Sequence, residues 1–305
     1  MIERVCVIGA GSIGSLFAGH LAQVCEVSVL TRRADHAAAL NADGLTISGR
    51  ADLQVSVVAS NDPGELPAFD LGILATKADG LEEAARTLQG HFPDAMIMTT
   101  LNGLGAEQVV RAHGSWPIIS AVTFMSGTRH SDTHVEFILD TETWMGPYEG
   151  LAYERVVEVA ELMTRAGLKV EAMPDLRPAQ WSKLIFNATV NTVAALTGLP
   201  HDPHFAAEAE LTDLGHLVHA LIDEGKAVAT AAGIELHDDP WLMNVLATQR
   251  GSAHYPSMLE DVEARRRTEI DLITGSLVRE AERIGVAVPL HTTMYRLIKA
   301  KEASW

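Results

Sequence analysis

The sequence predicts an α/β fold in two parts: a doubly wound, mostly parallel sheet in the N-terminal part and an all-α C-terminal part. Short β-branched runs alternate with helical patterns up to about residue 174. A glycine-rich turn stands between the first predicted strand and the first predicted helix. Beyond this part, strand signals nearly vanish and helical patterns continue to the end. We therefore expect two domains, 1–174 and 175–305, joined at the proline-rich stretch Met173–Pro178.

The composition is that of a globular protein. Of the 305 residues, 47% are hydrophobic and 21% are charged, which argues against a disordered chain. The formal net charge of −17 argues against nucleic acid and against anionic membrane surfaces as partners. No apolar run reaches the roughly 18 residues of a membrane span, and Glu3 stands where a secretory signal needs apolar residues. With Cys6 and Cys25 expected to be reduced, we predict a cytoplasmic protein.

The beginning of the chain has the order of elements that a dinucleotide-binding fingerprint of Rossmann type requires. The elements are a strand at Arg4–Ile8, the turn GAGSIG at 9–14, a helix at Ser15–Gln23 and a strand at Val27–Leu30. Gly9 would allow the tight turn, Gly11 would let backbone N–H groups approach a pyrophosphate, and Gly14 would let helix and strand pack closely. The motif therefore predicts a bound dinucleotide.

The residues after the second strand indicate which dinucleotide is bound. Enzymes that use NAD usually carry Asp or Glu there, and the carboxylate accepts hydrogen bonds from the ribose 2′-hydroxyl. This chain has Thr31-Arg32-Arg33 instead. Two guanidinium groups suit a 2′-phosphate, so the sequence favours NADP(H). The alternative is that the arginines are only solvated and the cofactor is NAD.

Two polar residues of the first part follow predicted buried strands. The remaining predicted strands of this part are Leu45–Ser48 and Gln54–Ala59 as an inserted hairpin, then Asp70–Thr76, Ala95–Leu101, Ile118–Thr123, Val135–Leu139, Thr143–Met145 and Leu168–Ala172. The remaining predicted helices are one near Asp35–Leu40 and those at Leu81–Leu88, Gly105–Ala112 and Leu151–Ala166. Lys77 and Asn102 each follow one of these strands. Because ligands gather at the carboxyl ends of parallel strands, both are expected at the ligand-binding edge.

The second part is predicted to be helical throughout. Its helices are expected at Trp181–Leu196, Ala206–Ala232, Asn244–Gln249, Met258–Ile284 and His291–Lys301. A joint between a nucleotide domain and a helical domain usually forms a cleft, which is a common place for a small-molecule site.

The first of these helices, in the stretch WSKLIFNATVNTVAALTG, is apolar around most of its circumference. Lys183, Asn187 and Asn191 nevertheless recur every four residues and form one polar stripe. Buried polar groups need partners. Two interpretations stay open: a structural network whose members satisfy each other, or the wall of a site whose ligand is the partner.

A second group of polar residues lies in SMLEDVEARRRTEIDLITG. Ser257 and Glu260 have the spacing of a capping box, which predicts a helix start there. Most charges of this segment are expected to form ordinary surface pairs. Glu269 lies between the apolar Ile270, Leu272 and Ile273, and we expect it to offer its carboxylate to Lys183, as in a common acid–base pair.

The histidines do not predict a metal site. His201 and His204 lie three residues apart, as do His216 and His219, but neither pair has a carboxylate or a third ligand at a recognisable spacing. We therefore expect surface and packing histidines and no bound metal.

With these motifs assembled, the chain resembles the ketopantoate reductases (2-dehydropantoate 2-reductases) over essentially its full length. The resemblance rests on GAGSIG, Lys77, Asn102-Gly103, WSKLIFNATVN and SMLEDVEARRRTEID. It implies an NADPH-dependent reduction of ketopantoate to pantoate in pantothenate biosynthesis. It also implies that Lys183 is the general acid and that Glu269 binds substrate and orients the lysine.

The resemblance implies further roles for single residues. Asn102 would lie beside the nicotinamide and the substrate, Asn187 and Asn191 would contact substrate oxygens, and Ser257 would contact the substrate carboxylate. Arg32 would recognise the NADPH phosphate. The predicted cofactor-binding residues are Gly9, Gly11, Ser12, Ile13, Gly14, Arg32, Lys77 and Asn102.

Three positions depart from the family pattern. His201 stands where the family has a substrate-contacting asparagine, Thr274 replaces the asparagine of an I-N-G segment, and Leu101 precedes Asn102 in place of glutamine. One alternative is therefore a related (R)-2-hydroxy-acid dehydrogenase acting on a branched or aromatic 2-oxo acid, with His201 near the substrate. Another is an NADP-binding sensor without catalysis. A small-molecule 2-oxo acid is the expected partner, and a homodimer stays open.

Overall fold

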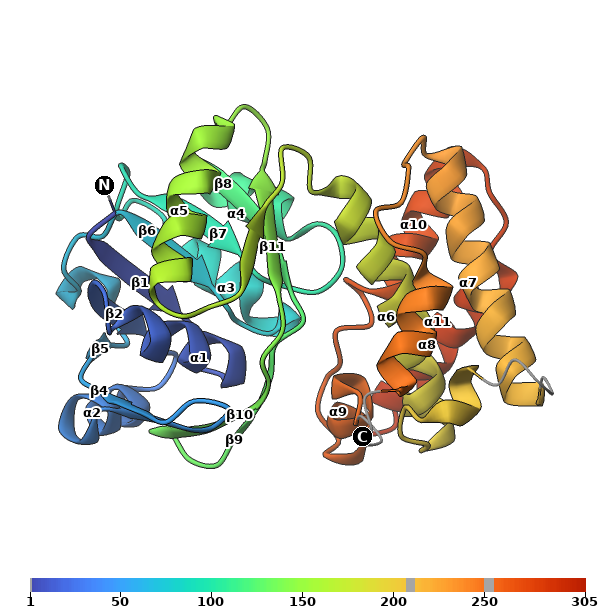
Figure 1. Cartoon of the computed structure of the whole chain (residues 1–305), viewed down its shortest axis with the longest axis horizontal. Helices are drawn as coiled ribbons and strands as arrows, with labels where there is room; N and C mark the ends of the chain where they lie inside the picture. Colours follow the sequence, from blue (N-terminus) through green and yellow to red (C-terminus); the bar gives the residue numbers. More distant parts are fainter. Residues whose placement is uncertain (1, 207–211, 250–254) are drawn as a thin grey trace. The chain divides into compact units, whose positions relative to one another are not determined.

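The computed structural model describes residues 2–206, 212–249 and 255–305 (Figure 1). The chain divides into two compact units. Unit 1 consists of Met1–Leu101 and Ala106–Leu176, and unit 2 consists of Asn102–Gly105 and Arg177–Trp305. The loop at 102–105 thus belongs with the helical part, although the sequence analysis assigned it to the nucleotide domain.

Unit 1 is built on an eight-stranded sheet in the order β12-β11-β8-β7-β6-β1-β2-β5. The strands are β1 (Arg4–Ile8), β2 (Glu26–Leu30), β5 (Val58–Ser60), β6 (Leu71–Leu74), β7 (Met96–Thr99), β8 (Ile118–Thr123), β11 (Thr143–Pro147) and β12 (Val170–Ala172). Neighbours pair in parallel except for β8 and β11, which are antiparallel. The central strands are apolar runs buried on both faces, as parallel strands between helices must be.

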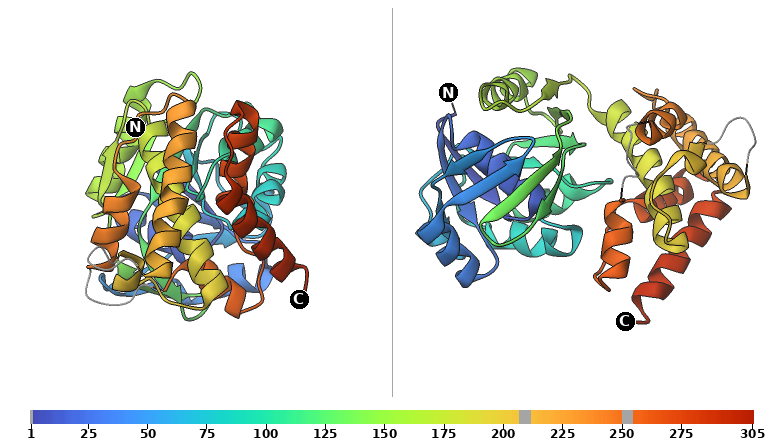
Figure 2. Two further views of the ribbon diagram at one scale, coloured as in Figure 1. Left: turned by 90° about the vertical axis from the view of Figure 1, so that its right-hand side faces the viewer. Right: turned by 60° about the horizontal axis from the view of Figure 1, so that its bottom comes forward.

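Helices cover both faces of this sheet (Figures 1 and 2). They are α1 (Ser12–Leu21), α2 (Ala34–Asp43), α3 (Ala78–Thr87), α4 (Ala106–His113) and α5 (Tyr153–Arg165), with a short 3₁₀ turn, η1 (Pro63–Glu65). Helix α1 packs beside α5, and α3 packs beside α4. The predicted doubly wound α/β fold is therefore confirmed.

A second, four-stranded sheet packs against α1. Its order is β4-β3-β10-β9, with β3 (Leu45–Gly49), β4 (Leu53–Val55), β9 (Ser126–Arg129) and β10 (His134–Leu139). The prediction of one strand at Gln54–Ala59 was wrong, because β4 pairs with β3 whereas β5 returns to pair with β2. Strand β9 was not predicted, since its sequence SGTR lacks apolar alternation.

Unit 2 is helical. Its elements are α6 (Arg177–Thr197), a 3₁₀ turn η2 (Pro203–Ala206), α7 (Asp213–Ala231), α8 (Pro240–Thr248), α9 (Ser257–Glu263), α10 (Thr274–Ile284) and α11 (Pro289–Glu302). Helix α6 lies at the centre and contacts α7, α8, α9, α10 and α11, and the left view of Figure 2 shows this bundle from a second direction. The residues at 207–211, part of the predicted helix Ala206–Ala232, lie outside the described residues.

The predicted helix Met258–Ile284 was wrong, because it is interrupted between α9 and α10. Arg265 has a φ of 50°, a left-handed conformation that no helix accommodates. The residues that follow, including Glu269, lie in neither helix nor strand. The predicted helix start is confirmed, because α9 begins at Ser257, but the predicted capping box is wrong: Pro256 is the N-cap, and no side-chain capping bond is formed. The interruption thus places Glu269 in a turn, where its carbonyl oxygen accepts from the N–H groups of Leu272 and Ile273 at 3.1 and 3.0 Å.

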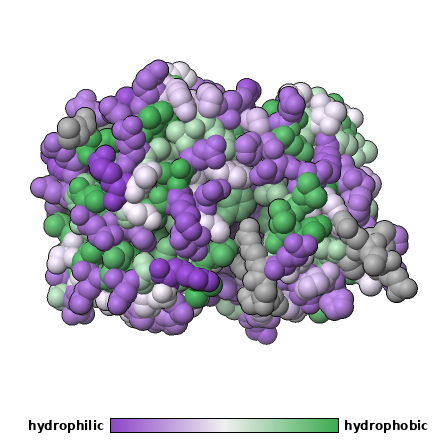
Figure 3. Space-filling model, in the orientation of Figure 1, coloured by the Kyte–Doolittle hydropathy of each residue, from purple (hydrophilic) through white to green (hydrophobic). Residues whose placement is uncertain are grey.

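The visible surface in Figure 3 is mostly hydrophilic, with hydrophobic patches between, one of them over α8. Two leucines of α8, Leu242 and Leu246, are 57% and 59% exposed. Among the described residues, no helix is both long enough and apolar enough to span a bilayer.

Candidate active site

The glycine turn of unit 1 has the geometry of a phosphate-binding loop. It connects β1 to α1, with Gly11 as the N-cap and Ser12 and Ile13 in the first helical turn. A Cβ on Gly14 would lie 1.9 Å from the carbonyl oxygen of Gly9, so only glycine lets the helix approach the turn this closely. A Cβ on Gly11 would meet no atom within 4 Å. The turn is therefore uncrowded at Gly11, beside the free N–H groups of the first helical turn, which are the kind of donors that bind a phosphate group.

Arg32 and Lys77 lie on either side of this turn. Strand β1 pairs in parallel with β2 on one side and with β6 on the other. Arg32 follows β2, and Lys77 is the N-cap residue of α3 after β6. Both side chains are exposed. The sheet order thus places the glycine turn and two cationic side chains along one edge, which suits an anionic dinucleotide.

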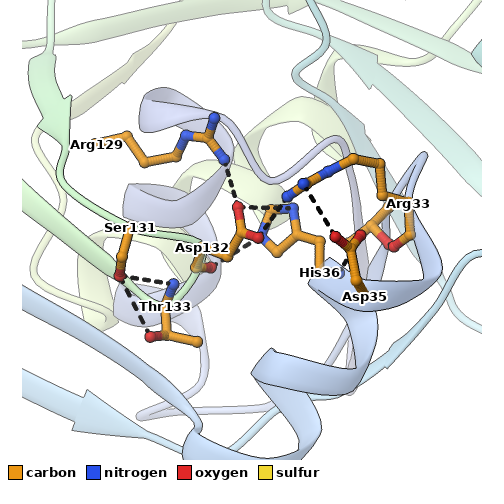
Figure 4. A network of polar contacts seen from close by, with 8 residues as sticks. Arg33, Asp35, His36, Arg129, Ser131, Asp132 and Thr133 are labelled. Atoms are coloured by element: carbon orange, nitrogen blue, oxygen red, sulfur yellow. Dashed lines mark hydrogen bonds and ion pairs between the residues drawn. The ribbon is translucent and has the colours of Figure 1, made fainter.

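Arg33, the next residue in the sequence, belongs to a cluster of charged and polar side chains around Asp132 (Figure 4). Asp132 forms ion pairs with Arg33 and, at 2.9 Å, with Arg129, and its backbone oxygen lies 2.8 Å from Nε2 of His36. Partial burial opposes ionisation of Asp132, but the bonds and charges of these neighbours outweigh it and lower its pKa. In the described part of the chain Arg32 makes no side-chain ion pair. Arg32 is therefore the guanidinium available to a phosphate, whereas Arg33 is neutralised by Asp132.

In unit 2, α6 carries the polar stripe that the sequence predicted. Lys183 and Asn191 are each 6% exposed, and Asn187 is half-buried. The surrounding positions, such as Leu184 and Ile185, belong to the hydrophobic core of the unit. Burial lowers the pKa of Lys183 from 10.5 to about 7, and the negative charge of Glu269 opposes this decrease. A lysine with this pKa can both hold and release a proton near neutral pH.

The loop at 102–105 brings Asn102 to this lysine-bearing helix. A Cβ on Gly103, whose φ is 95°, would lie 1.8 Å from the carbonyl oxygen of Leu272, so glycine is required for this close approach. The N–H of Leu104 donates to the same oxygen at 3.1 Å. Nε2 of Gln180 donates to the carbonyl oxygen of Gly103 at 3.3 Å. The loop is thereby held against both α6 and the segment that carries Glu269.

Asn102 links the other polar groups. Its Nδ2 donates to Oε2 of Glu269 at 3.0 Å, and its Oδ1 accepts from Nδ2 of Asn187 at 3.4 Å. Since Glu269 also acts electrostatically on Lys183, the structure groups four predicted site residues: Lys183, Glu269, Asn102 and Asn187. We name them the lysine cluster. It combines a proton donor of adjustable pKa with a carboxylate and two amides, which suits acid–base chemistry at an oxygen atom.

The other predicted substrate residues are not joined to this cluster by the contacts described. Asn191 lies one helical turn beyond Asn187, and Ser257 is exposed at the start of α9. His201 is 1% exposed, its Nε2 lies 2.8 Å from Oδ1 of Asn244, and the rings of Phe186 and Phe205 pack edge-on against it. This environment is that of a packing histidine.

Two kinds of residue were missed by the sequence analysis. Gln180 holds the loop that carries Asn102, and Asp132 pairs with Arg33 beside Arg32, but neither has a local pattern that marks it, because Gly103 and Arg33 lie far away from them along the chain. In the described residues, no group of three or more His, Cys, Asp or Glu side chains is arranged to hold a metal ion.

Comparisons with known proteins identify the family. Two family models, described as ketopantoate reductase PanE/ApbA and its C-terminal domain, match residues 5–150 and 175–302. The 2-dehydropantoate 2-reductase of Pyrococcus horikoshii is 30% identical over 301 residues, 98% of each chain. The structure of a PanE/ApbA family ketopantoate reductase from Ralstonia eutropha JMP134 matches with a TM-score of 0.88 and 26% identity over 99% of each chain.

A structure of D-mandelate dehydrogenase with NADH and anilino(oxo)acetate matches with a TM-score of 0.90 over 99% of each chain, but at 22% identity it shows the fold alone. The two family models, in contrast, together account for most of the sequence. Because one curated relative also reaches 30% identity over nearly the full length, this chain belongs to the ketopantoate reductase family of oxidoreductases.

Proposed function

We propose that this protein reduces a 2-oxo acid to its 2-hydroxy acid with NADPH, and that ketopantoate is the substrate, as a step of pantothenate biosynthesis in the cytoplasm. The observation that carries the proposal is the lysine cluster, in which a buried lysine with a pKa of about 7 is grouped with a carboxylate and two amides. The curated relatives are named 2-dehydropantoate 2-reductase, which supports the choice of substrate.

A bound nicotinamide cofactor supplies the hydride, and the residues of this chain manage the charge that results. As the ketone oxygen gains negative charge, the protonated Lys183 stabilises it and donates a proton from Nζ. Glu269 favours the protonated form of the lysine before this transfer. Asn102 donates a hydrogen bond to Glu269 and so holds the carboxylate in one orientation. Asn187, Asn191 and Ser257 are proposed to bind the oxygens of the substrate.

The preference for NADPH over NADH is part of the proposal. No carboxylate follows β2, and Arg32 is exposed at that place without an ion pair within the described residues. A guanidinium there would bind a 2′-phosphate and would gain nothing from a 2′-hydroxyl. Gly9, Gly11, Ser12, Ile13 and Gly14 are proposed to hold the pyrophosphate, with Lys77 on the far side of the turn.

A second candidate is a dehydrogenase for a branched or aromatic 2-oxo acid. The fold match to D-mandelate dehydrogenase, together with the departure at Thr274, is the observation that favours it, whereas the buried His201 packs against Asn244 and lends it no support. A third candidate, a sensor that binds NADP without catalysis, is disfavoured by the buried lysine cluster, which a sensor does not need.

One panel of assays distinguishes these candidates. Consumption of NADPH and of NADH is followed spectrophotometrically with ketopantoate, 2-oxoisovalerate and phenylglyoxylate. The proposal predicts the highest kcat/KM for NADPH with ketopantoate. A higher kcat/KM with phenylglyoxylate would select the second candidate, and cofactor binding without oxidation in any mixture would select the third.

A further inference from the structure

Three polar side chains on one face of α11 contact the segment that carries Glu269. They are Tyr295, Lys299 and Glu302, spaced by four and three residues, so that they lie along one side of the helix. The segment itself, residues 264–273, lies between α9 and α10 and forms neither helix nor strand; its backbone bonds, such as that from the N–H of Ile273 to the carbonyl oxygen of Glu269 at 3.0 Å, shape it only as turns. Its position therefore depends on contacts from neighbouring elements.

The first contact lies just before Glu269. Oε1 of Glu302 accepts hydrogen bonds from the backbone N–H of Thr268 at 2.8 Å and from its hydroxyl at 2.7 Å. The side chains of Glu302 and Thr268 are both largely buried, and the Glu302 side chain is 9% exposed. Two donors on one sheltered carboxylate oxygen make a directional contact, since charge-assisted hydrogen bonds are short and strong.

The second contact lies two residues after Glu269. Asp271 accepts a hydrogen bond from the Tyr295 hydroxyl at 2.7 Å and forms an ion pair with Lys299 at 2.8 Å. Partial burial opposes ionisation of Asp271, but these two bonds outweigh it and lower its pKa. Lys299 also lies 3.5 Å from Glu302, so the two contacts are connected through one lysine.

Glu269 thus lies between two residues that are both bonded to α11. We propose that Tyr295, Lys299 and Glu302 form an anchor that positions the Glu269 carboxylate toward Asn102 and Lys183, with Glu302 as the principal positioning residue. This inference rests on the proposed function, because it assigns the anchor to the proton-donating lysine of that reaction. None of the three anchor residues needs to touch substrate or cofactor.

The anchor has a consequence that a merely structural contact would not have. Glu269 raises the pKa of Lys183 against the effect of burial. If the anchor is broken and Glu269 moves away, its negative charge no longer offsets the effect of burial on the lysine. The pKa of Lys183 then decreases below its value of about 7. Less of the lysine is then protonated at neutral pH, and less proton donor is available.

The test measures the ionisation of Lys183 directly. The ε-carbon resonances of isotopically labelled lysines are titrated by NMR in the full chain, and Lys183→Met assigns the Lys183 signal. Glu302→Ala is expected to lower the Lys183 pKa by about one unit, toward the value found in Glu269→Gln. It is also expected to lower kcat by roughly ten- to a hundredfold, the scale of a misplaced catalytic group.

Two further variants make the result specific. Glu302→Gln keeps an acceptor oxygen for Thr268, so its kcat and its Lys183 pKa are expected to lie closer to those of wild type than to those of Glu302→Ala. Arg296→Gln changes an exposed residue of the same helix and is the matched control, with no expected change in either quantity. Far-UV circular dichroism and thermal unfolding verify that each variant is folded. If Glu302→Ala does not fold, Thr268→Val takes its place, because it removes one of the two hydrogen bonds to Glu302, and it is judged by the same criteria.

The outcomes separate the anchor from the proposed function. An unchanged Lys183 pKa in folded Glu302→Ala, while Glu269→Gln shifts it, would overturn the anchor. A shifted pKa in a protein that reduces none of the tested 2-oxo acids would support the anchor and overturn the proposed function.

Discussion

Replacing Lys183 by methionine should make the protein more stable while it lowers turnover by roughly a hundredfold or more. Lys183 lies within the hydrophobic core of unit 2 and is 6% exposed. Methionine retains most of the volume of the lysine side chain without its charge, so little new cavity is created. The perturbation therefore isolates the free-energy cost of keeping an ammonium group in this environment.

The magnitude follows from the pKa shift. The folded protein lowers the pKa of Lys183 from 10.5 to about 7, a difference of ~3.5 units, and each unit corresponds to ~1.36 kcal/mol. Between these two pKa values the unfolded chain binds the proton and the folded chain does not, so stability increases with pH across this window. Below pH 7 the full destabilisation, about 5 kcal/mol, is present. We expect Lys183→Met to recover about 2–4 kcal/mol of it at pH 6, since Glu269 loses its cationic neighbour.

Thermal unfolding of wild type and variant at pH 6 and at pH 10 measures this gain. The melting temperature of Lys183→Met should exceed that of wild type at pH 6, and the difference should shrink toward pH 10. Turnover with ketopantoate should fall by roughly a hundredfold or more, the scale of a lost general acid. Lys169→Met, at a residue whose side chain is 55% exposed, is the control and should change neither quantity appreciably. A lower melting temperature for Lys183→Met at pH 6, or unchanged turnover, would refute the reasoning.

Three further predictions concern titration and cofactor choice. For the reduction, kcat/KM should decrease as the pH rises through about 7, because Lys183 must be protonated; a pH–rate profile tests this, and a flat profile from pH 6 to 9 would contradict it. His291 is buried, and its pKa is lowered from 6.5 to about 4, so the unfolded chain binds a proton at this residue more readily than the folded chain does. The free energy of unfolding should therefore be highest above pH 6.5 and should decrease by ~3 kcal/mol as the pH falls to 4. His291→Gln should reduce this loss in denaturant titrations at pH 7 and pH 4.5, and an equal loss in both proteins would exclude His291 as its source. Asp132→Asn removes the carboxylate that pairs with Arg33 and Arg129, so both guanidinium groups should become available to the 2′-phosphate. A fluorescence titration should then show NADPH binding that is tighter by about three- to tenfold, with NADH binding unchanged. Weaker NADPH binding would instead mean that Asp132 is needed to hold these arginines.

Local patterns were sufficient wherever neighbours along the chain determine the structure. The run Arg4–Ile8 followed by GAGSIG predicted β1, the turn and α1, because strand burial and the turn geometry depend on adjacent residues. The polar stripe of Lys183 and Asn187 was visible because residues four apart share a face of any helix. The sequence alone thus determined the fold class, the family resemblance and the helix on which the lysine lies.

The tertiary structure decided where the partners of that lysine come from. Asn102 and Glu269 are 167 residues apart along the chain, and Asn102 and Asn187 are 85 apart. Their meeting depends on the close approach of Gly103 to Leu272 and on the interruption after α9, which no periodic pattern marks. The same holds for the burial of His201 beside Asn244. Helical and strand periodicity records which face of an element is apolar, whereas the pairing of polar groups from distant segments is set by packing, and only the folded chain specifies it.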